Sequence, residues 1–375
     1  MSSLRLAFLG DPSSVHLHRW LRTFVTRGHA VALLEPSPAA PAANPFELPE
    51  GVERLPIRSL PAHLGRGVLA ARADLRRHLD AWRPDVLHAH YARRPAWQAW
   101  LSGWRPYVVT VWGSDVLVTG PMTRVGRVAT RLALRDAAIV TAASQRLASA
   151  AVALGARPER VRAAELGIDT GRFRPGPADD ALRGALRLQG LRVILSPRML
   201  APLYRHEVVI EALAALPADV VVLSTAMLAD PVERARLEAH ASRLGVLERW
   251  RILPALDTAQ MADLYRLADV NVSVPETDAM AQSVLEAMAS GRPSVVSDLP
   301  DAREWLAELT PDWLVPVGDA KATAAALRDA LSLSPSARDA LGARLRQRVM
   351  DRADARRNMD MVEAWYGELA EAARR

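Results

Sequence analysis

Residues 268–298 read ADVNVSVPETDAMAQSVLEAMASGRPSVVSD: an apolar run, a polar loop, a helical run and a second apolar run. The run DVNVSVP predicts a strand, and SVLEAMAS predicts a helix that ends at Gly291, with Pro293 just after it. Runs that are apolar throughout are typical of parallel strands covered on both faces. The stretch therefore predicts a strand–loop–helix–strand unit of an α/β fold.

The same alternation recurs along the rest of the chain. Short runs rich in Val, Ile and Leu alternate with amphipathic helical stretches, which is typical of βαβ units and doubly wound sheets. In the first half the runs are LRLAFLG, HAVALLEP, DVLHAHY, YVVTVWG and AAIVTAAS, and in the second they are LRVILSP, DVVVLST, RWRILP, DVNVSVP, PSVVSD and DWLVPV. Two such series predict an α/β protein with two Rossmann-like domains.

A domain boundary is predicted near FRPGPADD, residues 173–180, where prolines and glycine cluster and the pattern breaks. We expect one domain over residues 1–175, a second over 176–353 and a terminal helix over 354–375. That helix would carry on one face, at spacings of three and four, Met359, Val362, Tyr366 and Leu369. Such an apolar face indicates packing back onto the first domain.

Composition narrows the function classes. At 375 residues the chain exceeds the usual size of one domain. It has no cysteine, which excludes disulfides, thiolate catalysis and Cys-based zinc sites. The net charge is +6 and Lys321 is the only lysine, so almost all positive charge is arginine. We attribute this to a coding bias; the alternative is affinity for phosphates or anionic membranes.

Three absences bear on partners and location. No dense arginine block with interleaved aromatic residues is present, so a nucleic-acid partner is not predicted. The N-terminus, MSSLRLAFLGDPSS, has an apolar run too short for a signal peptide. No run approaches the roughly 18 to 20 apolar residues of a membrane span. We expect a cytoplasmic protein, with peripheral contact to a membrane surface as an open alternative.

Ligands of open α/β sheets bind beyond the carboxyl ends of the strands. The segments expected at these ends are Gly10–Ser14, Trp112–Val116, Arg198–Arg205 and Val274–Gln282. The turn LGDPSS has one glycine, so the GxGxxG of dinucleotide dehydrogenases is missing, and no GxxxxGK[ST] phosphate loop occurs.

The loop PETDAMAQ would lead directly into the predicted helix. Main-chain N–H groups at the start of a helix suit a diphosphate, because the helix dipole is positive there. The outward-facing N–H groups would be those of Ala279, Met280, Ala281, Gln282 and Ser283. Asp278 and Glu286 would reach the same cleft, where each carboxylate accepts hydrogen bonds from the vicinal hydroxyls of a sugar or ribose. The alternatives are that Asp278 only caps the helix and that Glu286 lies on a solvated face.

The 269–298 block resembles the retaining GT-B glycosyltransferases of family 4. That family carries Glu–x7–Glu followed by Ala-Met-Ala-x-Gly-x-Pro-Val-Val, and this chain has Asp278–x7–Glu286 followed by AMASGRPSVVSD. Similar segments over nearly the whole chain are PDVLHAHY, YVVTVWGSDVL, LGIDTGRFRPG, LYRLADVNVSVPETD and DWLVPVGDA. The resemblance implies two Rossmann-like domains facing across a cleft, with the acceptor on the first and the nucleotide-sugar donor on the second.

The resemblance also implies roles for the donor side. Glu286 resembles the glutamate that binds the ribose hydroxyls, and Asp278 replaces the usual glutamate facing the donor sugar. The next three residues replace a glycine-rich stretch whose amides contact sugar and phosphate. Gly10 would let the main chain approach the donor phosphates. Arg198 matches a diphosphate-binding arginine, while the family's lysine is missing: Tyr204 or Leu203 stands near its place, and Arg205 follows.

On the acceptor side, Trp112 stands where many relatives have a histidine near the reacting sugar carbon. The resemblance places Gly113 and Asp115 in the loop facing the acceptor. The histidines that could take over the missing role are His90, His16, His18 and His88. The alternative for each is that it has a structural role or is exposed to solvent. Arg205 likewise has the alternative of a solvated charge at a helix start.

The function implied is a retaining glycosyltransferase. It would move a hexosyl-type sugar from a nucleoside-diphosphate sugar to an acceptor hydroxyl by same-face substitution, without metal or cofactor. Alternatives are a GT-B-fold nucleotide-sugar epimerase and a non-catalytic nucleotide-sugar binding protein. The base, the sugar, the linkage, the oligomeric state and the acceptor (glycan, lipid or small metabolite) are left open.

Overall fold

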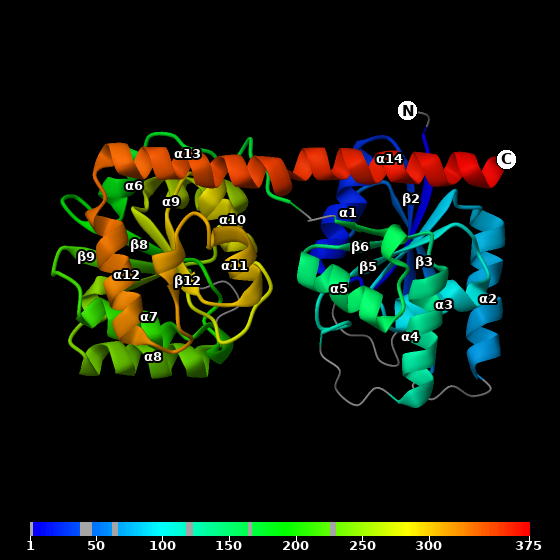
Figure 1. Ribbon diagram of the computed structural model, residues 1–375, viewed down its shortest axis with the longest axis horizontal. Coiled ribbons are helices and arrows are strands. Elements are labelled where there is room, and N and C mark those ends of the chain that lie inside the picture. Colours follow the sequence, from blue (N-terminus) through cyan, green and yellow to red (C-terminus); the bar gives the residue numbers. More distant parts are fainter. Residues whose placement is uncertain (1–2, 38–46, 62–66, 118–122, 164–166, 226–229) are drawn as a thin grey trace. The chain divides into compact units, whose positions relative to one another are not determined.

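The computed structural model describes residues 3–37, 47–61, 67–117, 123–163, 167–225 and 230–375. The chain forms two compact units. The N-terminal unit comprises residues 1–166 and 357–375, and the C-terminal unit residues 167–356. Each unit is built on one parallel sheet with helices packed against it (Figure 1).

The sheet of the N-terminal unit has seven strands in the order β3-β2-β1-β4-β5-β6-β7. The strands are β1 Arg5–Leu9, β2 Ala30–Ser37, β3 Val52–Arg58, β4 Val86–His90, β5 Tyr107–Val111, β6 Ile139–Ala142 and β7 Val161–Ala163. The helices are α1 Val15–Thr26, α2 Gly67–Trp82, α3 Arg94–Ser102, α4 Arg124–Asp136, α5 Gln145–Leu154 and the terminal α14 Ala355–Arg374.

The sheet of the C-terminal unit has six strands in the order β10-β9-β8-β11-β12-β13. The strands are β8 Arg192–Ser196, β9 Val220–Thr225, β10 Trp250–Leu253, β11 Val270–Ser273, β12 Ser294–Ser297 and β13 Leu314–Val315. The helices are α6 Asp180–Ala185, α7 His206–Ala214, α8 Pro231–Arg243, α9 Thr258–Leu267, α10 Gln282–Ala289, α11 Pro300–Leu306, α12 Ala320–Ser332 and α13 Pro335–Arg352.

Both faces of each sheet are covered, which explains the uniformly apolar strands. In β1, Leu6 and Phe8 join one buried cluster while Ala7 and Leu9 join the cluster on the opposite face. Alternate side chains of a strand point to opposite faces, so a strand with two covered faces is apolar at most of its positions. All the runs predicted as strands form strands, and the α/β prediction is confirmed.

Two strands were not predicted, and both lie at an edge of the N-terminal sheet. β3 has the sequence VERLPIR and is mostly exposed, and β7 has three residues, of which two are exposed. An edge strand packs less apolar surface, so its sequence lacks the uniform run that marks a central strand.

The terminal helix α14 packs on the N-terminal unit, which confirms that prediction. Met359, Val362 and Tyr366 are buried in the cluster that also contains Phe8. Polar contacts add to this packing, since the Glu363 carboxylate lies 3.0 Å from Nε2 of His29. No helix of the described residues is long and apolar enough to cross a bilayer.

Candidate functional site

The order of the C-terminal sheet reverses between β8 and β11, which lie side by side. Ligands of doubly wound sheets bind outside the carboxyl ends of the strands at such a reversal. Arg198 follows the end of β8 by two residues, and the loop 274–281 follows β11. The fold therefore brings together two segments that lie about 80 residues apart in the sequence.

Arg198 and Asp278 form an ion pair at this edge. Nη2 of Arg198 donates to Oδ2 of Asp278 at 2.7 Å, and Nη1 lies 3.5 Å from Oγ of Ser283. The two side chains are 12% and 25% exposed, so a face of the pair remains accessible. Burial raises the pKa of the Asp278 carboxyl, and the Arg198 charge opposes that rise.

The start of α10 completes the cluster. The N-cap residue is Ala281, whose side chain makes no capping hydrogen bond. The alternative in which Asp278 only caps this helix is therefore wrong. The N–H groups of Gln282 and Ser283 lie in the first turn, where the helix dipole favours an anion.

Ala279, Met280 and Ala281 form the last part of the loop. They line a small cavity together with Asp278 and with residues at the carboxyl end of β12. Met280 is half-buried and packs against the apolar core of the unit, whereas Ala279 is exposed. The core contact ties this part of the loop to the sheet edge.

Tyr265 connects Glu286 to the helix start. Its hydroxyl lies 3.1 Å from Oε2 of Glu286 and 2.9 Å from the carbonyl oxygen of Ser283. Burial raises the pKa of the Tyr265 hydroxyl well above its usual value, and the negative charge of Glu286 adds to this. Tyr265 therefore stays a neutral donor that orients the carboxylate.

The position near the missing lysine holds an aromatic ring. The guanidinium carbon of Arg198 lies 4.3 Å from the ring centroid of Tyr204, a cation–π contact. Arg205 has a φ of 51° and pairs with carboxylates, its Nε lying 2.8 Å from Glu207 and its Nη1 3.5 Å from Glu276. Arg198 thus carries the charge nearest Asp278 and Ser283, while Arg205 is held by acidic neighbours.

The sheet of the N-terminal unit reverses between β1 and β4, and Gly10 and His90 lie at these strand ends. A Cβ on Gly10 would lie 3.0 Å from Cδ2 of Leu17 and 3.2 Å from Cβ of His90, so a side chain there would press on both neighbours. The sequence alone suggests only that Gly10 lets the main chain approach the donor phosphates, and does not indicate this packing against Leu17 and His90.

His90 is 4% exposed, and neither of its ring nitrogens has a hydrogen-bond partner in the described part of the chain. Burial lowers its pKa to about 3, so the ring is neutral near pH 7. Trp112 stacks on His90 with centroids 5.7 Å apart and on His16 at 4.7 Å. The three rings form an aromatic cluster at the carboxyl edge of this sheet.

Asp115 holds the loop that follows β5. Its carboxylate is fully buried and accepts hydrogen bonds from the N–H groups of Trp112, Gly113 and Ala92 at 2.8 to 3.0 Å. Gly113 has a φ of 129°, which other residues rarely adopt. These contacts give Asp115 and Gly113 a structural role in shaping the loop around Trp112.

Comparison with known families identifies the chain. The family model "Glycosyl transferase 4-like" matches residues 5–144, and "Glycosyl transferases group 1" matches residues 179–348. The chain belongs to the glycosyl transferases group 1 family. Members of this family are retaining enzymes with the GT-B fold, as the sequence resemblance implied.

The curated relatives of this group 1 chain include D-inositol 3-phosphate glycosyltransferases. That of Geodermatophilus obscurus is 29% identical over 220 residues, which cover 52% of this chain and 47% of the relative. The enzyme of Xylanimonas cellulosilytica is 31% identical over 282 residues, which cover 68% of this chain and 64% of the relative. The chain therefore spans about half to two thirds of the length of these relatives.

Solved structures support the GT-B fold over almost the whole chain. Anabaena HepE in complex with UDP has a TM-score of 0.80 at 19% identity, covering 98% of this chain and 100% of that one. A glycosyltransferase from Rickettsia africae ESF-5 has a TM-score of 0.82 at 16% identity, covering 98% and 99%.

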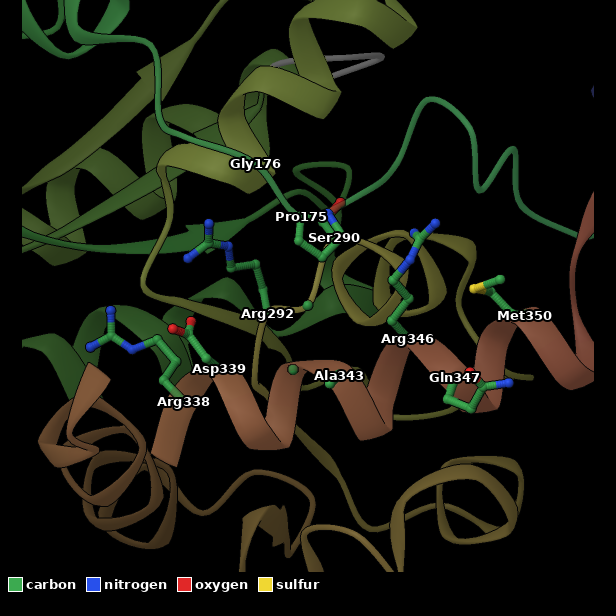
Figure 2. A pocket seen from close by; sticks show the side chains of 12 residues that line it. Pro175, Gly176, Ser290, Arg292, Arg338, Asp339, Ala343, Arg346, Gln347 and Met350 are labelled. Carbon is green, nitrogen blue, oxygen red and sulfur yellow. The ribbon is translucent and has the colours of Figure 1, made fainter. Parts of the chain in front are cut away.

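A larger pocket of the C-terminal unit, with a volume of about 470 Å³, lies elsewhere (Figure 2). It is lined by α13 and by residues 290–292, which precede β12, so it lies at the amino edge of the sheet, opposite Arg198. Its arginines are held by the protein: Arg346 donates to three main-chain carbonyls, and Arg338 pairs with Asp269 at 2.7 Å. We do not assign the donor to it.

Proposed function

We propose that this group 1 chain is a retaining glycosyltransferase that moves a hexosyl unit from a UDP-sugar to an acceptor hydroxyl. The observation that carries the proposal is the cluster of Arg198, Asp278 and Ser283 beside the start of α10, at the reversal of the sheet. UDP is the nucleotide we favour, because solved HepE structures contain UDP and UDP-glucose.

The diphosphate contacts Arg198 and the first N–H groups of α10 in this proposal. A guanidinium group has five N–H donors, and the pair with Asp278 uses one of them in the structure. Charge develops on the diphosphate as the glycosidic bond breaks, so fixed donors there lower the barrier. These groups supply positive charge without a metal ion.

The ribose and the sugar are assigned to the two carboxylates. Glu286, oriented by Tyr265, accepts hydrogen bonds from the ribose hydroxyls. Asp278 faces the donor sugar, and the amides of the residues from Ala279 to Ser283 contact sugar and phosphate. Because Glu207 and Glu276 already hold Arg205, we give it a lesser role than Arg198.

The acceptor side is assigned to the N-terminal unit. His90, with two unpartnered ring nitrogens in the described chain, is the group we place nearest the acceptor hydroxyl. Trp112, Gly113 and Asp115 shape that surface, and Gly10 keeps it open. The departing diphosphate takes the proton of the acceptor hydroxyl as the new bond forms on the same face. Among the described residues no group of three or more His, Asp or Glu is placed to hold a metal.

A nucleotide panel tests the donor site. We expect UDP to raise the melting temperature more than GDP, ADP, CDP or TDP, since a ligand at 100 times its Kd stabilises by about 2.7 kcal/mol. Arg198→Gln should reduce the shift, and Arg192→Gln, at the start of the strand that precedes Arg198, should leave it intact. No shift with any nucleoside diphosphate would overturn the proposal.

Incubation with UDP-sugars separates the alternatives. A transferase hydrolyses its donor slowly without an acceptor and transfers the sugar when an acceptor is added. An epimerase would isomerise the sugar, and a non-catalytic binding protein would leave the donor intact over days.

A further inference from the structure

The outer face of α4 carries two parallel stripes of opposite character. α4 buries the small residues of one side against α3 and α5. At 100° per residue, four arginines fall on one strip of the remaining surface and three apolar side chains on the strip beside it. The outer face of α4 consists of Arg124, Arg127, Arg131 and Arg135, with Val125, Val128 and Leu132.

The apolar stripe is unusually exposed. Val125 and Val128 are 56% and 57% exposed, and Leu132 is half-buried beside them. Of the large apolar side chains exposed in the described residues, Val125 and Val128 are the two that share a helix. Single exposed apolar residues are ordinary, whereas a contiguous apolar patch rimmed by polar residues is typical of an interaction surface.

The arginine stripe has no carboxylate beside it on α4. On other helices some surface arginines are paired, such as Arg76 with Asp80 and Arg234 with Glu238, and others, such as Arg72, form no ion pair within the described residues. Within the described residues, Arg124, Arg127 and Arg131 form no ion pair, and α4 has no acidic residue before Asp136. A coding bias explains the choice of Arg over Lys, but it does not explain why four arginines line up beside the exposed Val125 and Val128.

We propose that the outer face of α4 docks onto an anionic lipid bilayer. Amphipathic helices that lie in a membrane interface combine an arginine-rich polar strip with an apolar strip that enters the acyl boundary. The guanidinium groups would bind lipid phosphates, each contributing about fivefold to affinity near an anionic surface, while Val125, Val128 and Leu132 enter the interface. A nucleic-acid partner would use the arginines alone and leave the apolar strip exposed.

Vesicle co-sedimentation of the full chain tests this docking. We expect binding to vesicles of phosphatidylglycerol and phosphatidylcholine, weaker binding at high salt, and little binding to phosphatidylcholine alone. Arg124→Gln with Arg127→Gln should weaken binding about 25-fold, at about fivefold per arginine. Val125→Asp with Val128→Asp should weaken it at least as much, through the apolar strip.

The matched control is on α8 of the other unit, where Val232→Asp with Arg234→Gln changes the same residue types at exposed positions. This control should bind vesicles as the unmodified chain does. An unchanged melting temperature, and an unchanged rise in melting temperature on addition of UDP, would show that the α4 variants fold. Vesicle binding that is absent, or unaffected by both α4 variants, overturns the proposal, as does arginine-dependent binding to RNA with none to vesicles.

Discussion

The phenol of Tyr265 holds the carboxylate of Glu286, with Oη 3.1 Å from Oε2 and the ring completely buried. The two residues come from α9 and α10, on either side of β11. A carboxylate oriented before the nucleotide arrives loses less conformational freedom on binding, so the pair preorganises the proposed ribose contact.

Replacing Tyr265 by Phe therefore should weaken UDP binding about tenfold, because a hydrogen bond to a charged group contributes about 1.5 kcal/mol or more. Isothermal titration measures the change in Kd. Tyr107→Phe is the control, since its hydroxyl also makes a buried bond, 2.6 Å to the carbonyl of Ala133, but lies in the other unit. An equal loss of UDP affinity in both variants would contradict an orienting role.

The sequence predicts the strands of this protein better than it predicts the side-chain contacts of the candidate site. Central strands are recognisable because both of their faces are buried, whereas the edge strand β3 has polar residues and a proline. Arg198 and Asp278 could be predicted as neighbours because both follow adjacent strands of the sheet. The contacts of Tyr265 and Tyr204 could not, because the pattern of strands and helices does not fix the direction in which a single side chain points.

Arg198→Lys should lower turnover about 100-fold while keeping the charge. Lysine has no planar fork, so it cannot contact Asp278 and the Ser283 region together, nor stack on Tyr204 in the same way. Steady-state kinetics with the identified donor measures the effect, and UDP affinity should fall much less than turnover. Arg192→Lys, which alters a surface pair with Asp219, should leave turnover within twofold. Equal turnover of the two variants would remove Arg198 from the diphosphate site.

Tyr366→Phe should loosen α14 from the N-terminal unit. The Tyr366 hydroxyl lies 2.5 Å from Nδ1 of His88, and Nε2 of His88 lies 2.7 Å from Oγ1 of Thr110. Removing the hydroxyl leaves a buried ring nitrogen without its partner, at a cost of about 1 to 3 kcal/mol. Hydrogen exchange should rise along α14, and the melting temperature should fall. Met361→Ala, on the exposed face of the helix, should change neither; unaltered exchange in Tyr366→Phe would contradict the coupling.

His90→Phe should make the N-terminal unit less sensitive to acid. Burial holds the pKa of His90 at about 3, whereas an unfolded histidine titrates near 6.5. Between these pH values the unfolded state binds a proton that the folded state does not. Above pH 6.5 the buried histidine therefore does not reduce the free energy of unfolding, whereas below it that free energy falls by about 1.4 kcal/mol for each pH unit. Phenylalanine does not titrate and fits among Phe8, Trp20 and Trp112.

Melting temperatures of the His90→Phe variant from pH 7 to 4 should decline less steeply than those of the unmodified chain, while UDP binding is kept and transfer is lost. An unchanged slope would show that His90 already accepts a proton in the folded state, and full transfer activity would remove it from the acceptor site.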